Sequence, residues 1–259
     1  MSNCLKIFIS LFHVVLALNV LYGQELQLST PEVNTSQAFL QGSPILLKYD
    51  FRMQGAIIRY TLDGKMPTIS SKIYSKPIAI KSKCIVRAAV FHPDFQSSDE
   101  VVTNIYARPI KVAKVTISKP NDKYSGDGSA SIHDGVFGTL DFKSKYLGFN
   151  EGSVEATIKL NKKQKIKQVS ISLLVQQGSW IFGPSRVTIL SEVGKQLSEY
   201  IAQTPISNEK TQKKVIIIPL SNVYSDRLKI VISPLGSIPF WHDGAGSKGW
   251  LFIDEIWVE

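Results

Sequence analysis

Apolar and polar residues alternate along most of the chain with the period of two that is typical of half-buried β-strands. In the first half, short runs of β-branched and aromatic residues are separated by Gly, Pro, Asn and Asp. The window that comes nearest to a helical period, residues 196–203, fits a strand equally well. Strands are predicted at 45–51, 56–62, 73–80, 85–91 and 100–106. About seven short strands within residues 24–107 predict an immunoglobulin-like β-sandwich.

The second half continues the alternation. Apolar residues of 154–160, 169–175 and 227–232 alternate with polar or outward-facing ones, whereas residues 215–218 are apolar on both faces and are predicted to be central. Roughly nine strands over residues 111–259 predict a jelly roll. The fold class predicted from these patterns is therefore all-β, with two sandwiches in sequence.

A domain boundary is predicted at residues 107–110. Pro109 follows the last strand of the first half, and a new strand pattern begins at Lys111. The linker contains no flexible Ser or Gly run, so the two domains are expected to touch. The predicted organisation is residues 1–23, 24–107 and 111–259.

The first of these segments has the pattern of a secretory signal peptide. Lys6 precedes an almost wholly apolar run at 7–21, and Gly23 offers a small residue for cleavage. The run is shorter than the roughly 20 residues of a membrane span, so no span is expected after signal cleavage. An uncleaved anchor is the alternative. The prediction is an exported protein, in the periplasm, at the cell surface or outside the cell.

Cysteine and charge add little to this picture. Cys84 is the only cysteine beyond the signal, and it alternates with Val86 and Ala88 as a small core residue does. The formal net charge is +9, and its densest group of lysines surrounds Asn161, which favours a solvated hairpin turn. No aromatic residues are interleaved with them, so nucleic acid is not a predicted partner. These lysines are Lys159, Lys162, Lys163, Lys165 and Lys167.

Residues 58–90 carry a resemblance to a known module. The sequence YTLDG at 60–64, Pro67-Thr68, Ile73-Tyr74 and the strand at 84–90 resemble the small sandwich beside the catalytic barrel of bacterial chitobiases and β-N-acetylhexosaminidases. The resemblance implies a module that accompanies carbohydrate enzymes without catalysis, in which Tyr60 and Tyr74 are packing residues.

Residues 111–259 carry a second resemblance. IHDG at 132–135, YLGF at 146–149, VEATI at 154–158, IKQV at 166–169 and WLFIDEI at 250–256 follow the order of a discoidin-type domain. Such domains are the coagulation factor V/VIII type C modules, which are similar to family 32 carbohydrate-binding modules. Together, the two domains resemble the tail of an exported glycosidase.

The sequence offers no convincing reaction centre. Asp254-Glu255 is an adjacent acidic pair of the kind that hexosaminidases use, but neighbours on a strand are expected to face opposite sides. A catalytic barrel needs about 250 residues of strand–helix alternation, which this chain lacks. His92, His133 and His242 are not at zinc-ligand spacing. The protein is therefore predicted not to be an enzyme.

The discoidin resemblance implies a structural calcium ion. It would be held by Asp134, by backbone oxygens and the Thr139 hydroxyl of the loop at 134–139, and by Glu255 on the last strand. The alternative is that Asp134-Gly135 is a simple turn and Glu255 a solvated strand residue.

Carbohydrate recognition requires an aromatic platform with hydrogen-bonding groups at its rim. Two loops, at 178–184 and 240–244, contain such residues. Trp180, Trp250 and Trp257 have apolar neighbours that favour core positions, whereas Trp241 lies in a polar loop. The predicted ligand-binding residues are Trp241, His242, Asp243, Trp180, Arg186 and His133.

The preferred function is a non-catalytic protein that binds a glycan. One alternative is an accessory fragment or subunit of a glycoside hydrolase, which would then be its partner. The other is a structural or protein-interaction role without sugar binding.

Overall fold

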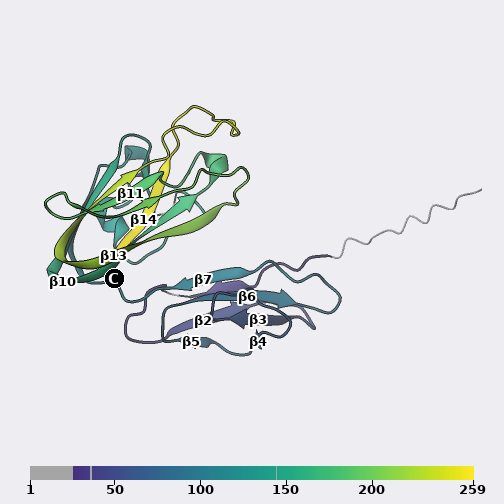
Figure 1. Ribbon diagram of the computed structural model, residues 1–259. Coiled ribbons are helices and arrows are strands. Elements are labelled where there is room, and N and C mark those ends of the chain that lie inside the picture. The colour runs from purple at the N-terminus through teal and green to yellow at the C-terminus, as the bar shows by residue number, and fades with distance from the viewer. Residues whose placement is uncertain (1–25, 36, 144) are drawn as a thin grey trace, which may run out of the picture.

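The computed structural model describes residues 26–35, 37–143 and 145–259. The predicted signal peptide lies outside these residues. The described chain is all-β, as predicted, and its only helical segments are three short 3-10 turns. Figure 1 shows an immunoglobulin-like sandwich followed by a jelly-roll sandwich. No described helix has the length and apolar character required to traverse a bilayer.

The first sandwich packs a three-stranded sheet, β1-β2-β5, on a four-stranded sheet, β4-β3-β6-β7. Residues that alternate along β2, such as Ile45 and Leu47, pack against Val86 and Ala88 of β6 in a core between the sheets. The strands are β1 (Glu32–Asn34), β2 (Ile45–Asp50), β3 (Ile57–Thr61), β4 (Lys72–Ile73), β5 (Ile78–Ile80), β6 (Cys84–Phe91) and β7 (Val101–Ile105).

One predicted strand of this domain was wrong. Residues 73–80 were expected to form a single strand, but β4 and β5 belong to different sheets. Pro77 lies between them and lacks the N–H that a ladder requires. Tyr74, just before this break, places its hydroxyl against the backbone N–H of Tyr49 at 3.1 Å, which supports the packing role predicted for it.

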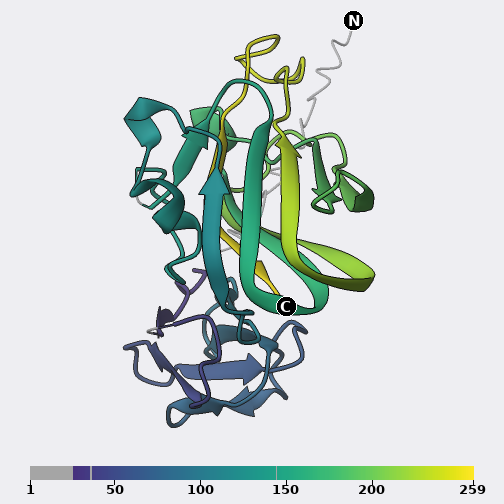
Figure 2. The same ribbon diagram turned by 90° about the vertical axis from the view of Figure 1, so that its left-hand side faces the viewer.

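In its described residues, the second sandwich has seven strands rather than the roughly nine expected. Two of them, β10 and β13, are 22 residues long and pair with each other over almost their whole lengths. Figure 2 shows both strands bending together at the end of the domain nearest the C-terminus. The strands are β8 (Val112–Ile117), β9 (Leu147–Phe149), β10 (Val154–Val175), β11 (Arg186–Leu190), β12 (Gln196–Ile201), β13 (Gln212–Ser233) and β14 (Leu251–Val258).

This continuity corrects the predicted hairpin around Asn161. The chain bends there without leaving the sheet, and the pairing with β13 only shifts register between Lys159 and Gln164. The first half of β10 pairs with β8, and the second half pairs with β14. The same strand therefore contributes to both layers, and the core is enclosed between its two halves.

The sheet around β14 is covered on both faces. Ile253 and Ile256 belong to the main core, whereas Phe252 packs with Tyr146 and Leu174 on the other face. Consequently every residue of β14 is buried, which explains why six of its eight residues are apolar and makes the buried Asp254 and Glu255 exceptional.

Candidate ligand-binding site

Three loops meet at the end of the second domain that lies opposite the bend of β10 and β13. They follow β10 (residues 176–185), β12 (202–211) and β13 (234–250). Gln177, which is 7% exposed and belongs to the first of these loops, forms hydrogen bonds with the other two. Its side chain donates to the Ile206 carbonyl at 2.8 Å and accepts from the Glu209 N–H at 3.2 Å. Its own carbonyl lies 3.0 Å from His242 Nε2.

His242 holds the longest of these loops in shape. Its Nδ1 accepts a hydrogen bond from the Gly244 N–H at 2.9 Å, so the proton is on Nε2 and is donated to the Gln177 carbonyl. The ring packs edge-on against Trp180, Phe182 and Trp241, with centroids 5.5 to 6.4 Å apart. Both nitrogens are used within the protein, so His242 positions its aromatic neighbours.

Aromatic side chains reach the surface around His242. Trp180 is 40% exposed and Phe240 is 93% exposed, while Trp241 is half-buried and Asp243 is exposed. The core position expected for Trp180 was wrong, because this residue adopts the left-handed conformation, φ 61°, at the end of a 3-10 turn. Of the other tryptophans, Trp257 is buried and Trp250 is half-buried.

A concave pocket of about 730 Å³ adjoins this aromatic group. It lies over the open end of the sandwich, where Val175 and Ile216 of the core reach its floor. Phe182, which packs on His242, lines one side, and Tyr200 of β12 lines another. Glu209 and Lys214, whose charged atoms are 3.8 Å apart, add a polar edge. The sequence signal for this pocket was weak, because its residues come from five separated segments.

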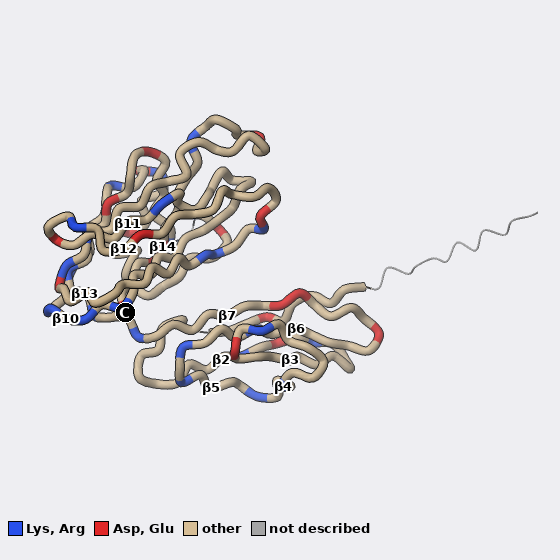
Figure 3. Tube along the Cα trace, viewed as in Figure 1, with Lys and Arg blue, Asp and Glu red and all other residues tan. Residues whose placement is uncertain are grey.

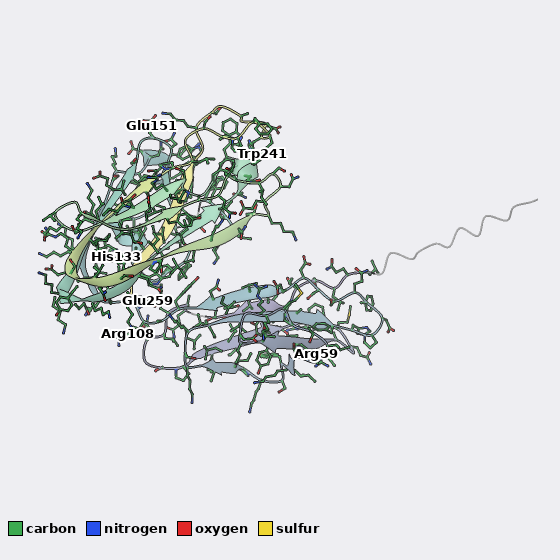
Figure 4. The ribbon with its side chains drawn as sticks, viewed as in Figure 1. Arg59, Arg108, His133, Glu151, Trp241 and Glu259 are labelled. Atoms are coloured by element: carbon green, nitrogen blue, oxygen red, sulfur yellow. The ribbon has the colours of Figure 1, made fainter. Side chains whose placement is uncertain are left out.

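Two predicted ligand residues lie elsewhere. The Arg186 guanidinium points to β12, where it pairs with Glu199 at 3.5 Å. His133 lies near the first domain, far from Trp241, and its Nδ1 is 2.9 Å from the Ser129 carbonyl (Figure 4). The structure therefore brings together Trp180, Trp241, His242 and Asp243, but not Arg186 and His133.

The loop at 134–139, expected to hold calcium, lies over the last strand. The Gly135 N–H donates to Glu255 Oε1 at 2.5 Å, and the Gly138 N–H donates to Asp254 Oδ2 at 2.7 Å. Adjacent strand residues thus reach the same loop, contrary to the expectation that they face opposite sides. The physical reason is a β-bulge, because Ser172 pairs with Glu255 and Leu173 with Ile253, which leaves Asp254 unpaired.

Burial dominates the electrostatics of this acidic pair. Asp254 and Glu255 are 0% and 1% exposed. The pKa of Glu255 is raised to about 8, chiefly by burial; the Gly135 N–H lowers it, and a hydrogen bond with Asp134 raises it. Burial also raises the pKa of Asp254, whose Oδ1 has no hydrogen-bond partner among the described residues.

These residues fit a calcium ion in part. Asp134 and Glu255 supply carboxylate oxygens close together, and Asp254 Oδ1 is a buried oxygen with unused capacity. Lys145, however, already lies 3.7 Å from Asp134, and Thr139 Oγ1 accepts from the Asp141 N–H at 3.1 Å. Among the described residues, no three His, Cys, Asp or Glu side chains form a metal-binding group. The calcium site stays a prediction.

Comparison with known families matches residues 45–106 to the family described as Fn3 associated. No curated protein matches the chain. The finer resemblance of the first domain to chitobiases stays a prediction.

Solved structures give likenesses of low identity. A Ruminococcus gnavus GH29 fucosidase in complex with fucose is 15% identical over 56% of this chain, with a TM-score of 0.32. The CBM32 of AlyQ in complex with 4,5-unsaturated mannuronic acid is 14% identical over 58% of this chain and 97% of its own, with a TM-score of 0.35. The SusE-like protein BT2857 is 13% identical over 89% of this chain and 97% of its own, with a TM-score of 0.38.

The alignment spans 24% of the fucosidase's length. All three TM-scores are below 0.5, so the conclusions below depend on the geometry of this chain itself.

Proposed function

We propose that the protein is an exported, non-catalytic carbohydrate-binding protein whose second domain binds a glycan at the aromatic loops. The observation that carries the proposal is the exposure of Trp180 and Phe240 beside a pocket of about 730 Å³. Large exposed aromatic surfaces are uncommon on soluble proteins unless they bind something. A pyranose ring presents C–H groups that stack on such faces.

The surroundings supply the hydrogen bonds that a sugar requires. Asp243 is exposed next to Trp241, and its carboxylate can accept from sugar hydroxyls. In the adjoining pocket, Glu209 and Lys214 offer an acceptor and a donor near the Tyr200 ring. Such a shallow site buries little of a sugar, so weak to moderate affinity is expected.

The buried acidic pair supports a role without catalysis. Asp254 and Glu255 are covered by the loop at 134–139 and are bonded to its backbone, so a substrate has no path to them. A structural calcium ion under this loop remains part of the proposal. For the first domain we propose a spacer or docking role, with a glycoside hydrolase related to β-N-acetylhexosaminidases as the partner enzyme.

An array of neutral glycans tests the proposed site. Trp180→Ala and Phe240→Ala are expected to weaken binding about tenfold each, because each removes one stacking face. Tyr224→Ala is the matched control, since Tyr224 is 66% exposed on a different strand, β13. Equal binding by all four proteins to every bound glycan would place the site elsewhere, and no binding by the wild type would reject the function.

A further inference from the structure

A second surface of the molecule has no role in the site above. Exposed lysines line β8 and the bend of β10, at the end of the second domain opposite the aromatic loops (Figure 3). We call this the lysine surface. It consists of Lys111, Lys114, Lys159, Lys162, Lys163, Lys165 and Lys167.

Positive charges on this surface lie directly opposite one another. Lys159 of β10 is the register partner of Lys114 on β8 and also of Arg227 on β13. Directly opposite side chains have Cβ atoms roughly 5 Å apart, at which like charges repel. Arg227 is neutralised by an ion pair with Glu192. None of the seven lysines forms an ion pair with any residue of 26–35, 37–143 or 145–259.

Protection of a sheet edge explains only part of this pattern. β8 pairs with β10 alone, and lysines on such an edge strand prevent pairing with other chains. Lys159 is different, because it lies on a strand that is hydrogen-bonded on both sides at this position. The repulsion between the exposed Lys114 and Lys159 costs the folded protein a little stability, which a bound anion would offset.

We propose that the lysine surface binds an acidic polysaccharide, in which carboxylates or sulfates recur along a chain of pyranose rings. Rows of ammonium groups at the spacing of neighbouring strands suit repeated anionic groups. Tyr224, which is 66% exposed, is the register partner of Lys165 and offers an aromatic face beside the charges. A pyranose can stack there while its acidic group meets a lysine.

Other anionic partners fit the surface less well. A single-stranded nucleic acid is usually held by several aromatic residues that stack successive bases, and Tyr224 is a single platform. A membrane surface favours apolar side chains that insert among the lipids. No large apolar residue of 111–117 or 159–167 is exposed.

Binding of the full chain to polygalacturonate, measured by affinity electrophoresis or calorimetry at low salt, tests the proposal. The double variant Lys114→Gln/Lys159→Gln is expected to weaken binding about fivefold, while its unfolding temperature stays equal or rises because the repulsion is gone. The matched control is Lys72→Gln/Lys76→Gln, which removes two exposed lysines of the first domain. Neither pairs with a carboxylate of the described residues, and the variant is expected to bind as the wild type does.

Three results would overturn the proposal. The first is an equal loss of polygalacturonate affinity in the two double variants. The second is undiminished binding of the wild type to methyl-esterified polygalacturonate. The third is tighter binding to single-stranded DNA or to phosphatidylglycerol vesicles at the same salt concentration. Trp180→Ala separates this surface from the proposed neutral-glycan site, because it is expected to leave polygalacturonate binding unchanged. The proposal for the lysine surface can therefore be rejected without rejecting the proposed site at the aromatic loops, and the reverse is also true.

Discussion

The indole ring of Trp257 packs against the phenol ring of Tyr106, with centroids 4.9 Å apart and planes 62° apart. Trp257 belongs to the last strand of the second domain, and Tyr106 ends the first domain just before the linker. Phe39 and Phe137 complete this cluster, one from each domain. Beyond it, the Ile110 N–H donates to the Val258 carbonyl at 2.8 Å. The two domains are thus joined by a packed aromatic contact.

Phe39→Ala is expected to weaken the aromatic contact between the two domains. Phe39 is 4% exposed and contacts Tyr106, Phe137 and Trp257, so truncation removes about 3 kcal/mol of packing. Calorimetry should show a lower unfolding temperature and a broader or split transition as the domains uncouple. Phe142→Ala, within the second domain, should lower stability without splitting the transition. An unchanged profile for Phe39→Ala would show that the domains are held by other contacts.

Gln177→Ala is expected to release the loops of the candidate site. It removes both side-chain hydrogen bonds to residues 206–209, to the Ile206 carbonyl and from the Glu209 N–H, at a cost of about 2 kcal/mol. Amide hydrogen exchange should become faster at 202–209, and glycan binding should weaken. Gln196→Ala, at an exposed position of β12, should change neither. Unaltered exchange at 202–209 would contradict the role of Gln177.

Gly244→Ala tests the position of Trp180 without removing an aromatic ring. A Cβ on Gly244 would lie 2.9 Å from the Trp180 ring, so the indole must shift. Weaker glycan binding, by about fivefold, is expected with a loss of stability of about 1 kcal/mol. Gly178→Ala, where a Cβ meets nothing within 4 Å and which does not line the pocket, serves as the control. Full binding by Gly244→Ala would show that the Trp180 position is unimportant.

The calcium prediction is tested by thermal unfolding. If calcium binds only the folded protein, a concentration 100 times its Kd adds about 2.7 kcal/mol to stability, and EDTA removes it. Glu255→Gln should abolish the response, whereas Glu151→Gln should keep it because Glu151 is an exposed residue of another loop. The absence of any shift in the wild type would reject the site.

In EDTA, stability should depend on pH through Glu255. Its pKa is raised from 4.5 to about 8 by burial, so the folded protein binds a proton that the unfolded chain has lost over this range. Stability is therefore highest below the unfolded pKa and should fall as the pH rises from about 5 to 8. Glu255→Gln cannot ionise and should flatten this slope. Parallel slopes for the two proteins would assign the pH dependence to other groups.

Strand positions were largely predictable from sequence, because the alternation of apolar and polar residues indicates which face of a strand is buried. Residues such as Ile45 and Leu47 alternate with exposed neighbours, and they lie where the pattern placed them. The continuity of β10 was not predictable, because exposed polar residues at a bend look the same as those of a hairpin turn. Only the pairing with β13 distinguishes the two cases.

The candidate site was predictable only in part. The loop sequence around Trp241 indicated an exposed aromatic, but the exposure of Trp180 depends on a left-handed backbone that its neighbours Ile181 and Phe182 do not reveal. Likewise, the convergence of Asp254 and Glu255 depends on a bulge opposite Ser172, and the residue types of β14 do not reveal a bulge. Local sequence identifies residue types, whereas tertiary pairing decides which of them meet.

The long ladder between β10 and β13 also governs how the second domain can form. Its partners are separated in sequence by β11 and β12, so the ladder closes only after a distant segment has been synthesised and has found its register. Chains dominated by such non-local contacts fold slowly, over milliseconds to seconds. Because both layers share these two strands, we expect the two layers to form together, and the loops that carry the aromatic residues to acquire their positions only once the ladder is in place.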